Sequence, residues 1–241
     1  NDLLNMRRTI LISGSSRGIG RAIAEELLRS GHRISLGVRN TEIFKDTFLD
    51  PKVSGNENIL LNNYDANNEL DAENWVQRTV DNFKSIDTVI NCAGIFHKTG
   101  LIFKKEERET IEELWSTNVM GPWLLTKNAW EHLSKHGQGR IIVLVSMSGK
   151  RSKGNLAGYS MSKFALMGLC QTMRNEGWDQ GIRTTAISPG WVNTDMAANV
   201  TTINKDEMTQ PNDIAKIVSN LLSLPNSSIP FEINLNCNLE K

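Results

Sequence analysis

The stretch TILISGSSRGIGRAIAEELL, residues 9–28, sets the expectation for the fold. An apolar run of β type at 9–13 leads into a turn with three glycines, Gly14, Gly18 and Gly20, and an amphipathic helical pattern follows. Glycines between a strand and a helix allow a tight turn, and the free backbone N–H groups of the helix N-terminus suit a phosphate group. The spacing is G-x-x-x-G-x-G rather than G-x-G-x-x-G, so the turn needs support from the rest of the chain.

The rest of the chain repeats this alternation of strand and helix. Apolar residues that recur every three or four positions predict helices at 19–30, 70–83, 110–133 and 160–177. Short β-type runs predict strands at 9–13, 33–38, 59–63, 87–91, 140–145, 183–187 and 231–236. Alternating strands and helices imply a parallel sheet with helices on both faces, and right-handed crossovers favour a doubly wound sheet over a barrel. We therefore predict an α/β fold with a Rossmann-type, doubly wound parallel sheet of about seven strands.

The domain organisation follows from length and composition. A chain of 241 residues with no internal repeat or linker fits one domain, with 1–5 as a loose leader and 50–58 as a turn-rich loop. The 27 basic and 27 acidic residues cancel, so no overall field favours nucleic acid or an anionic membrane. No apolar run approaches the roughly 20 residues of a membrane span. Nucleic-acid and membrane roles are therefore not expected.

Cysteine and histidine usage bears on location and metal binding. Cys92, Cys170 and Cys237 are odd in number and far apart, which argues against a disulfide framework or a cysteine-ligated zinc site and predicts a cytoplasmic protein. His132 and His136 share the end of a predicted helix, but the sequence offers no third ligand beside them. We predict no metal site.

Further motifs follow the other predicted strands in order. NCAG at 91–94 follows the fourth strand, Asn118 lies in the next helix, and Ser146 follows the fifth strand. Tyr159 and Lys163 come 13 and 17 positions after Ser146, and SPGWVNTD at 188–195 follows the sixth strand. With the first turn, where Ser13 replaces a threonine, this ordered set resembles the short-chain dehydrogenase/reductase family over roughly residues 7–236.

The resemblance implies an oxidoreductase that transfers a hydride between a nicotinamide C4 and a carbonyl or alcohol carbon. Asn118, Ser146, Tyr159 and Lys163 would be its catalytic residues, with Tyr159 as the general acid/base. Residues four apart on a helix have Cβ atoms about 5–6 Å apart, so Tyr159 and Lys163 share a face. We expect the Lys163 ammonium and an oxidised nicotinamide to lower the pKa of the Tyr159 phenol, by roughly 1–3 units per favourable charge.

The same motifs imply a cofactor site, and two arginines indicate which cofactor it takes. The second strand leads into Arg39 without a carboxylate, and Arg17 lies inside the first turn, so both could bind a 2′-phosphate. We therefore expect NADPH/NADP rather than NADH. The expected cofactor-binding residues are Gly14, Ser16, Arg17, Gly18, Ile19, Gly20, Arg39, Asp65, Ala66, Asn91, Ala93, Gly94, Tyr159, Lys163, Pro189, Gly190, Val192 and Thr194.

The substrate side is less defined. Candidate pocket walls are Ile95, Phe96, His97, Met147, Trp191 and Val192, which suggest a partly apolar carbonyl or alcohol substrate. The run KRSK at 150–153 could contact an anionic substrate, although a solvated loop is the favoured reading. The tail lacks the closing glycines of the family's last strand, which bears on the tetramer contact that the family often builds with this strand. We expect a homo-oligomer, either a homodimer or a homotetramer.

Two alternatives stay open at this point. A catalytically silent NADP(H)-binding sensor or scaffold would keep the fold, but it has no need of the Tyr159 acid/base group. A sugar-nucleotide epimerase or dehydratase can share the Tyr-x-x-x-Lys spacing, but it usually has a larger C-terminal substrate region than this sequence offers.

Overall fold

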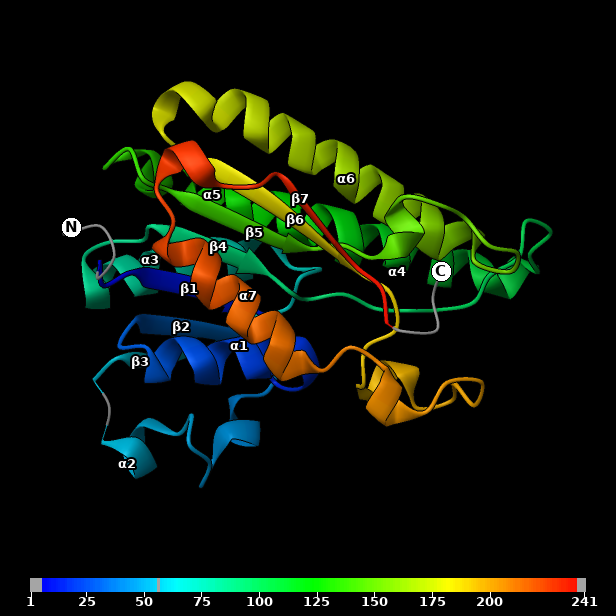
Figure 1. Ribbon diagram of the computed structural model, residues 1–241, viewed down its shortest axis with the longest axis horizontal. Coiled ribbons are helices and arrows are strands. Elements are labelled where there is room, and N and C mark those ends of the chain that lie inside the picture. The colour runs from blue at the N-terminus through cyan, green and yellow to red at the C-terminus, as the bar shows by residue number, and fades with distance from the viewer. Residues whose placement is uncertain (1–5, 56, 238–241) are drawn as a thin grey trace.

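The computed structural model describes residues 6–55 and 57–237, so the expected leader at 1–5 lies outside the described residues. The strands form one seven-stranded parallel sheet in the order β3-β2-β1-β4-β5-β6-β7 (Figure 1). The strands are β1 (Thr9–Ser13), β2 (Arg33–Val38), β3 (Ile59–Asn63), β4 (Thr88–Asn91), β5 (Arg140–Leu144), β6 (Arg183–Pro189) and β7 (Glu232–Leu235). The order reverses between β1 and β4, as in a Rossmann-type doubly wound sheet. The predicted fold class is confirmed.

Helices cover both faces of the sheet. They are α1 (Gly18–Arg29), α2 (Pro51–Ser54), α3 (Glu69–Phe83), α4 (Arg108–Trp115), α5 (Gly121–Ser134), α6 (Ala157–Gly177) and α7 (Pro211–Ser223). Because successive side chains of a strand point to opposite faces, Ile10 and Ile12 of β1 join a core with α1 and α7. Leu11 between them joins a second core with α3, α5 and α6. Figure 1 shows α1 beside α7 on one face of the sheet.

Three local features differ from the sequence-based expectation. The helix predicted at 110–133 is divided into α4 and α5 by a π-helical segment at Ser116–Met120. The loop expected at 50–58 contains α2, whose first turn is capped by the Asp50 side chain accepting from Lys52 N. The helix α7 was not predicted, although it begins with a proline at its first position and has a buried apolar face.

The described residues contain no helix that is both long and apolar enough to cross a membrane. Cys92 and Cys170 are free thiols. The last strand, which lacks the family's closing glycines, nevertheless pairs in parallel with β6.

Candidate active site

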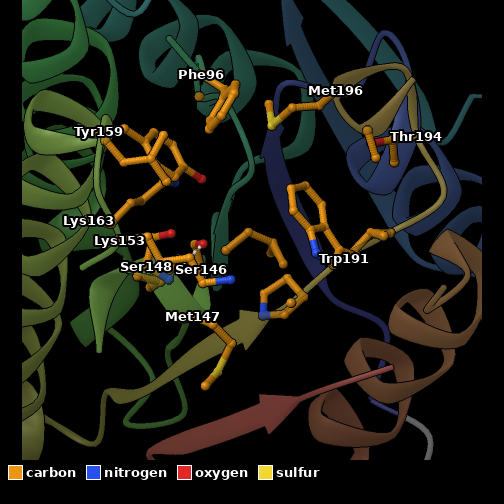
Figure 2. A pocket seen from close by; sticks show the side chains of 18 of the residues that line it. Phe96, Ser146, Met147, Ser148, Lys153, Tyr159, Lys163, Trp191, Thr194 and Met196 are labelled. Carbon is orange, nitrogen blue, oxygen red and sulfur yellow. Dashed lines mark hydrogen bonds between the residues drawn. The ribbon is translucent and has the colours of Figure 1, made fainter. Parts of the chain in front are cut away.

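A cavity of about 430 Å³ opens at the carboxyl ends of the central strands. Its lining comes from segments that follow β1, β4, β5 and β6, and Figure 2 shows Ser146, Tyr159 and Lys163 on one side with Trp191, Thr194 and Met196 on the other. In a doubly wound sheet the crevice beside the order reversal is the usual ligand site. The expected site residues that line this cavity are Ile19, Gly94, Ser146, Tyr159, Lys163, Pro189, Gly190, Val192 and Thr194.

The first turn is packed directly against the segment that follows β4. Gly14 has a left-handed backbone with φ +62°, and a Cβ on it would lie 2.7 Å from the Ala93 backbone nitrogen. A Cβ on Gly20 would collide with the Gly14 carbonyl. The Ser13 hydroxyl accepts hydrogen bonds from the Cys92 and Ala93 backbone N–H groups, both at 3.1 Å. Serine therefore serves in place of the family's threonine, and the two motifs form one rigid unit.

The expected catalytic residues Ser146, Tyr159 and Lys163 lie after β5 and in the first two turns of α6. Ser146 lies two residues after the end of β5, and its hydroxyl accepts from Ser148 N at 3.0 Å. Tyr159 is 7% exposed, and its ring contacts Phe96 edge to face with centroids 4.9 Å apart. Lys163 is buried one helical turn further on, with its ammonium 5.7 Å from the centroid of the Tyr159 ring. The predicted alignment of these two side chains on one helix face is therefore observed.

The electrostatics of this pair differ from the expectation. Burial raises the pKa of the Tyr159 phenol, and a hydrogen bond with Ser146 opposes that rise. Burial also lowers the pKa of Lys163 to about 8, so its ammonium is itself costly to keep charged. In the protein alone the Tyr159 pKa is therefore raised rather than lowered, because burial is the largest influence on it. The expected lowering, which also depends on an oxidised nicotinamide, stays a prediction.

Asn118 is fully buried in the π-helical segment rather than exposed on a helix surface. Its amide oxygen accepts from Ile95 N at 2.8 Å, and its amide nitrogen donates to Ile95 O at 3.0 Å and to the Ser162 hydroxyl at 3.1 Å. A Cβ on Gly94 would lie 3.3 Å from the Asn118 amide oxygen and 3.7 Å from the Lys163 nitrogen. Asn118 therefore fixes the segment after β4 beside Lys163.

The remaining expected cofactor residues lie around the first turn and the ends of β2, β3 and β4, outside the cavity lining. Arg39 is exposed, and Arg17 lies 3.9 Å from the Asp195 carboxylate, with both side chains largely exposed. Asp65 accepts from the backbone and side-chain nitrogens of Asn67, as a turn-capping aspartate does. The others outside the lining are Gly14, Ser16, Gly18, Gly20, Ala66, Asn91 and Ala93.

Two of these residues make contacts that fix backbone rather than reach the cavity. The buried Asn91 side chain donates to the Thr126 hydroxyl on α5 at 3.1 Å. Ala66 packs against the start of the same helix, where a Cβ on Gly121 would lie 2.8 Å from the Ala66 Cβ. Both therefore hold α5 against the ends of β3 and β4.

The substrate side combines apolar walls with basic side chains. Ile95, Phe96, Met147, Trp191 and Val192 line the cavity as expected, whereas His97 does not. Within the KRSK run, Arg151 and Lys153 line it. Lys150 instead pairs with Glu232 of β7 at 2.9 Å. Lys98 also lines the cavity and was missed, although its position four residues after Gly94 of NCAG is a signal that could have identified it.

The strand order, the crowded glycine turn and the Ser146, Tyr159 and Lys163 cluster define a dinucleotide-binding oxidoreductase fold and site. The family described as short chain dehydrogenase matches residues 8–205. The chain belongs to the short-chain dehydrogenase/reductase family. It is 38% identical over 217 residues to an agropine synthesis reductase of Rhizobium rhizogenes. The matched region covers 90% of this chain and 49% of that relative. The chain thus spans about half the length of that relative.

Two further similarities extend over most of both chains. A 3-oxoacyl-[acyl-carrier-protein] reductase of Synechocystis is 28% identical over 79% of this chain and 76% of its own length. The solved structure of an alcohol dehydrogenase from Thermococcus sibiricus, complexed with 5-hydroxy-NADP, is 26% identical with a TM-score of 0.84. That similarity covers 98% of this chain and 99% of the other, so the described fold is shared over nearly its whole length.

Proposed function

We propose that this protein is an NADPH-dependent reductase of a carbonyl compound, or the corresponding alcohol dehydrogenase in reverse. The observation that carries the proposal is that Ser146, Tyr159 and Lys163 line one cavity together with Ile19 at the start of α1 and with the segment after β6. The Tyr159 hydroxyl points into that cavity (Figure 2). A site that only bound a dinucleotide would have no use for a buried acid/base group beside a second hydroxyl.

The residues present fit a dinucleotide cofactor. The first turn has bare backbone at Gly14 and Gly20, where no Cβ can be accommodated, and it opens α1, whose N-terminal N–H groups suit a pyrophosphate. Gly94 leaves the Lys163 ammonium close to bare backbone, which suits ribose hydroxyls. We propose that Thr194, whose methyl group would lie 3.3 Å from a Cβ on Gly18, borders the carboxamide. The alcohol dehydrogenase from Thermococcus sibiricus, solved with 5-hydroxy-NADP, supports the same assignment.

The side chains of this site would divide the chemistry at the substrate oxygen. When bound, the reduced nicotinamide supplies the hydride to the carbonyl carbon. Tyr159 donates its phenolic proton to the oxygen that gains negative charge, and the Ser146 hydroxyl hydrogen-bonds the same oxygen and orients it. Lys163 orients the ribose, and Asn118 holds the backbone around it. The apolar walls at Phe96 and Trp191 exclude water from the reacting atoms.

The proposal is tested by following NADPH oxidation with a panel of carbonyl compounds: a 3-oxoacyl thioester, a sugar, a steroid-like ketone and a small aldehyde. We expect turnover with at least one of them, and the reverse reaction with its alcohol. Tight NADPH binding together with inactivity toward every member would contradict the enzyme assignment and point to a sensor.

The preference for NADPH over NADH is expected to depend on Arg39. Replacing Arg39 with aspartate removes a guanidinium and places a carboxylate where a 2′-phosphate would lie, so kcat/KM with NADPH should fall about 10- to 100-fold while kcat/KM with NADH holds or rises. Steady-state kinetics with both cofactors measure the change. Arg78→Asp on the exposed face of α3 makes the same charge change at a distance and should leave both values unaltered. An unchanged NADPH preference in Arg39→Asp would refute this role.

We also propose that the protein forms a homo-oligomer through α4, α5 and α6. These helices expose large apolar side chains at Trp115, Trp123, Met161 and Phe164, between 40% and 50% exposed. We propose that these side chains meet a second copy of the chain, since large apolar side chains gathered on a surface often mark an interface. We expect Phe164→Glu to shift a dimer or tetramer toward monomer in sedimentation velocity, whereas Val53→Glu on α2 should not. A wild-type monomer would contradict the proposal.

A further inference from the structure

The charged side chains that line the cavity all carry the same sign. They are Lys98, Arg151, Lys153 and Lys163, and no aspartate or glutamate is among the lining residues that the structure describes. Lys163 is buried beside Tyr159 and belongs to the reacting groups. The other three are exposed and lie on the segments that follow β4 and β5. The substrate side of the cavity therefore has a basic wall, by which we mean Lys98, Arg151 and Lys153.

The two segments that carry the basic wall are joined into one structure. Thr99 forms an isolated parallel bridge with Leu156. The Thr99 carbonyl accepts from Ala157 N at 2.8 Å, and its hydroxyl accepts from Gly158 N at 3.1 Å. Lys98 precedes Thr99 in sequence, and Arg151 and Lys153 lie a few residues before Leu156. The hydrogen bonds of Thr99 therefore hold the backbone of Lys98 close to the segment that carries Arg151 and Lys153. The three cations do not lie on independent loops.

The basic wall has no acidic partner of its own. None of its three cations forms an ion pair with a carboxylate of the described residues, whereas the adjacent Lys150 is paired with Glu232 outside the cavity. Cations of one sign that line a concave, partly apolar site raise the local concentration of anions. The groups expected to bind cofactor phosphates, the first turn and Arg39, follow β1 and β2 instead. The wall is therefore available to the substrate.

We propose that the substrate carries an anionic group, either a carboxylate or a phosphate, and that Lys98, Arg151 and Lys153 bind it. The apolar walls at Ile95, Met147 and Trp191 would contact the carbon chain between this group and the carbonyl. Arginine suits either oxyanion because its planar fork can make two parallel hydrogen bonds. This substrate class rests on the proposed reductase function, but the anion site can be tested without turnover.

The test measures the binding of three probes to the protein saturated with NADP: hexanoate, hexyl phosphate and hexanamide. They share an apolar chain and differ in the charge of the head group. We expect at least one anion to bind about tenfold or more tightly than the amide in isothermal titration, as charge-assisted hydrogen bonds predict. The triple variant Lys98→Gln, Arg151→Gln, Lys153→Gln should lose this advantage and keep its affinity for hexanamide. Lys104→Gln, an exposed basic residue outside the cavity lining, is the matched control and should keep the advantage.

The outcomes separate this proposal from the proposed function. Failure of either anion to bind better than hexanamide, or an anion preference that survives in the triple variant, would overturn the anion site. A triple variant that loses NADPH affinity to the same extent would also overturn it, because the cations would then serve the cofactor. Inactivity toward all carbonyls would refute the reductase function and leave the binding comparison intact. A preference for hexanoate or for hexyl phosphate supports the proposal and identifies the head group.

Discussion

Replacing Tyr159 with phenylalanine is expected to lower kcat by about 10²- to 10⁴-fold, the usual contribution of a general acid/base. The substitution removes only the hydroxyl that points into the cavity, and the edge-to-face packing of the ring on Phe96 remains possible. The loss should therefore appear in kcat rather than in the affinity for NADPH. Steady-state kinetics on the best carbonyl from the panel, with NADPH binding measured separately, test the prediction.

The second tyrosine of the chain provides the matched control for this experiment. Tyr64 is 5% exposed, packs on Trp75 with ring centroids 4.7 Å apart, and does not line the cavity. Tyr64→Phe removes the same atom from an equally buried ring and should leave kcat unchanged. A Tyr159→Phe enzyme with normal kcat, or equal losses in the two variants, would show that the hydroxyl of Tyr159 is not the proton donor.

Most of the fold could be predicted from sequence because parallel strands buried on both faces are short, apolar and bounded by polar residues. The first three predicted strands have the observed bounds, and the other four differ by one or two residues, at one end or, for β7, at both ends. Helix α7 was missed because its sequence follows a run of polar loop residues. Its apolar face can be recognised only from its packing against α1. Its packing partner lies about 190 residues away in sequence.

The site was predictable where a motif ties residue type to position in the fold. Ser146, Tyr159 and Lys163 follow this rule, and the cavity brings them together. Lys98 does not belong to a motif. Its position four residues after Gly94 was an available signal, but the Thr99 bridge is what places it beside the segment after β5. The direction in which the Tyr159 pKa is shifted could not be predicted from the sequence either, because it depends on how deeply the phenol is buried.

Replacing Gly14 with alanine is expected to disable both the fold of the first turn and the binding of NADPH. The left-handed backbone at φ +62° costs roughly 1–2 kcal/mol for a residue with a Cβ. The new methyl group would also lie 2.7 Å from the Ala93 backbone nitrogen, and forcing an extra methyl into a packed site typically costs about 1–3 kcal/mol more. The free energy of unfolding should therefore fall by about 2–5 kcal/mol in urea denaturation, and NADPH should bind about tenfold or more weakly.

A second variant, Gly31→Ala, separates the cost of backbone strain from the cost of crowding by the new methyl group. Gly31 also has a left-handed backbone, at φ +85°, but no atom lies within 4 Å of the position that a Cβ would occupy. Gly31→Ala should therefore cost only the roughly 1–2 kcal/mol of backbone strain and leave NADPH affinity unchanged. The difference between the two variants isolates the contact between the first turn and the segment after β4. Equal destabilisation, with NADPH affinity preserved in both, would mean that this close contact plays no part in forming the cofactor site.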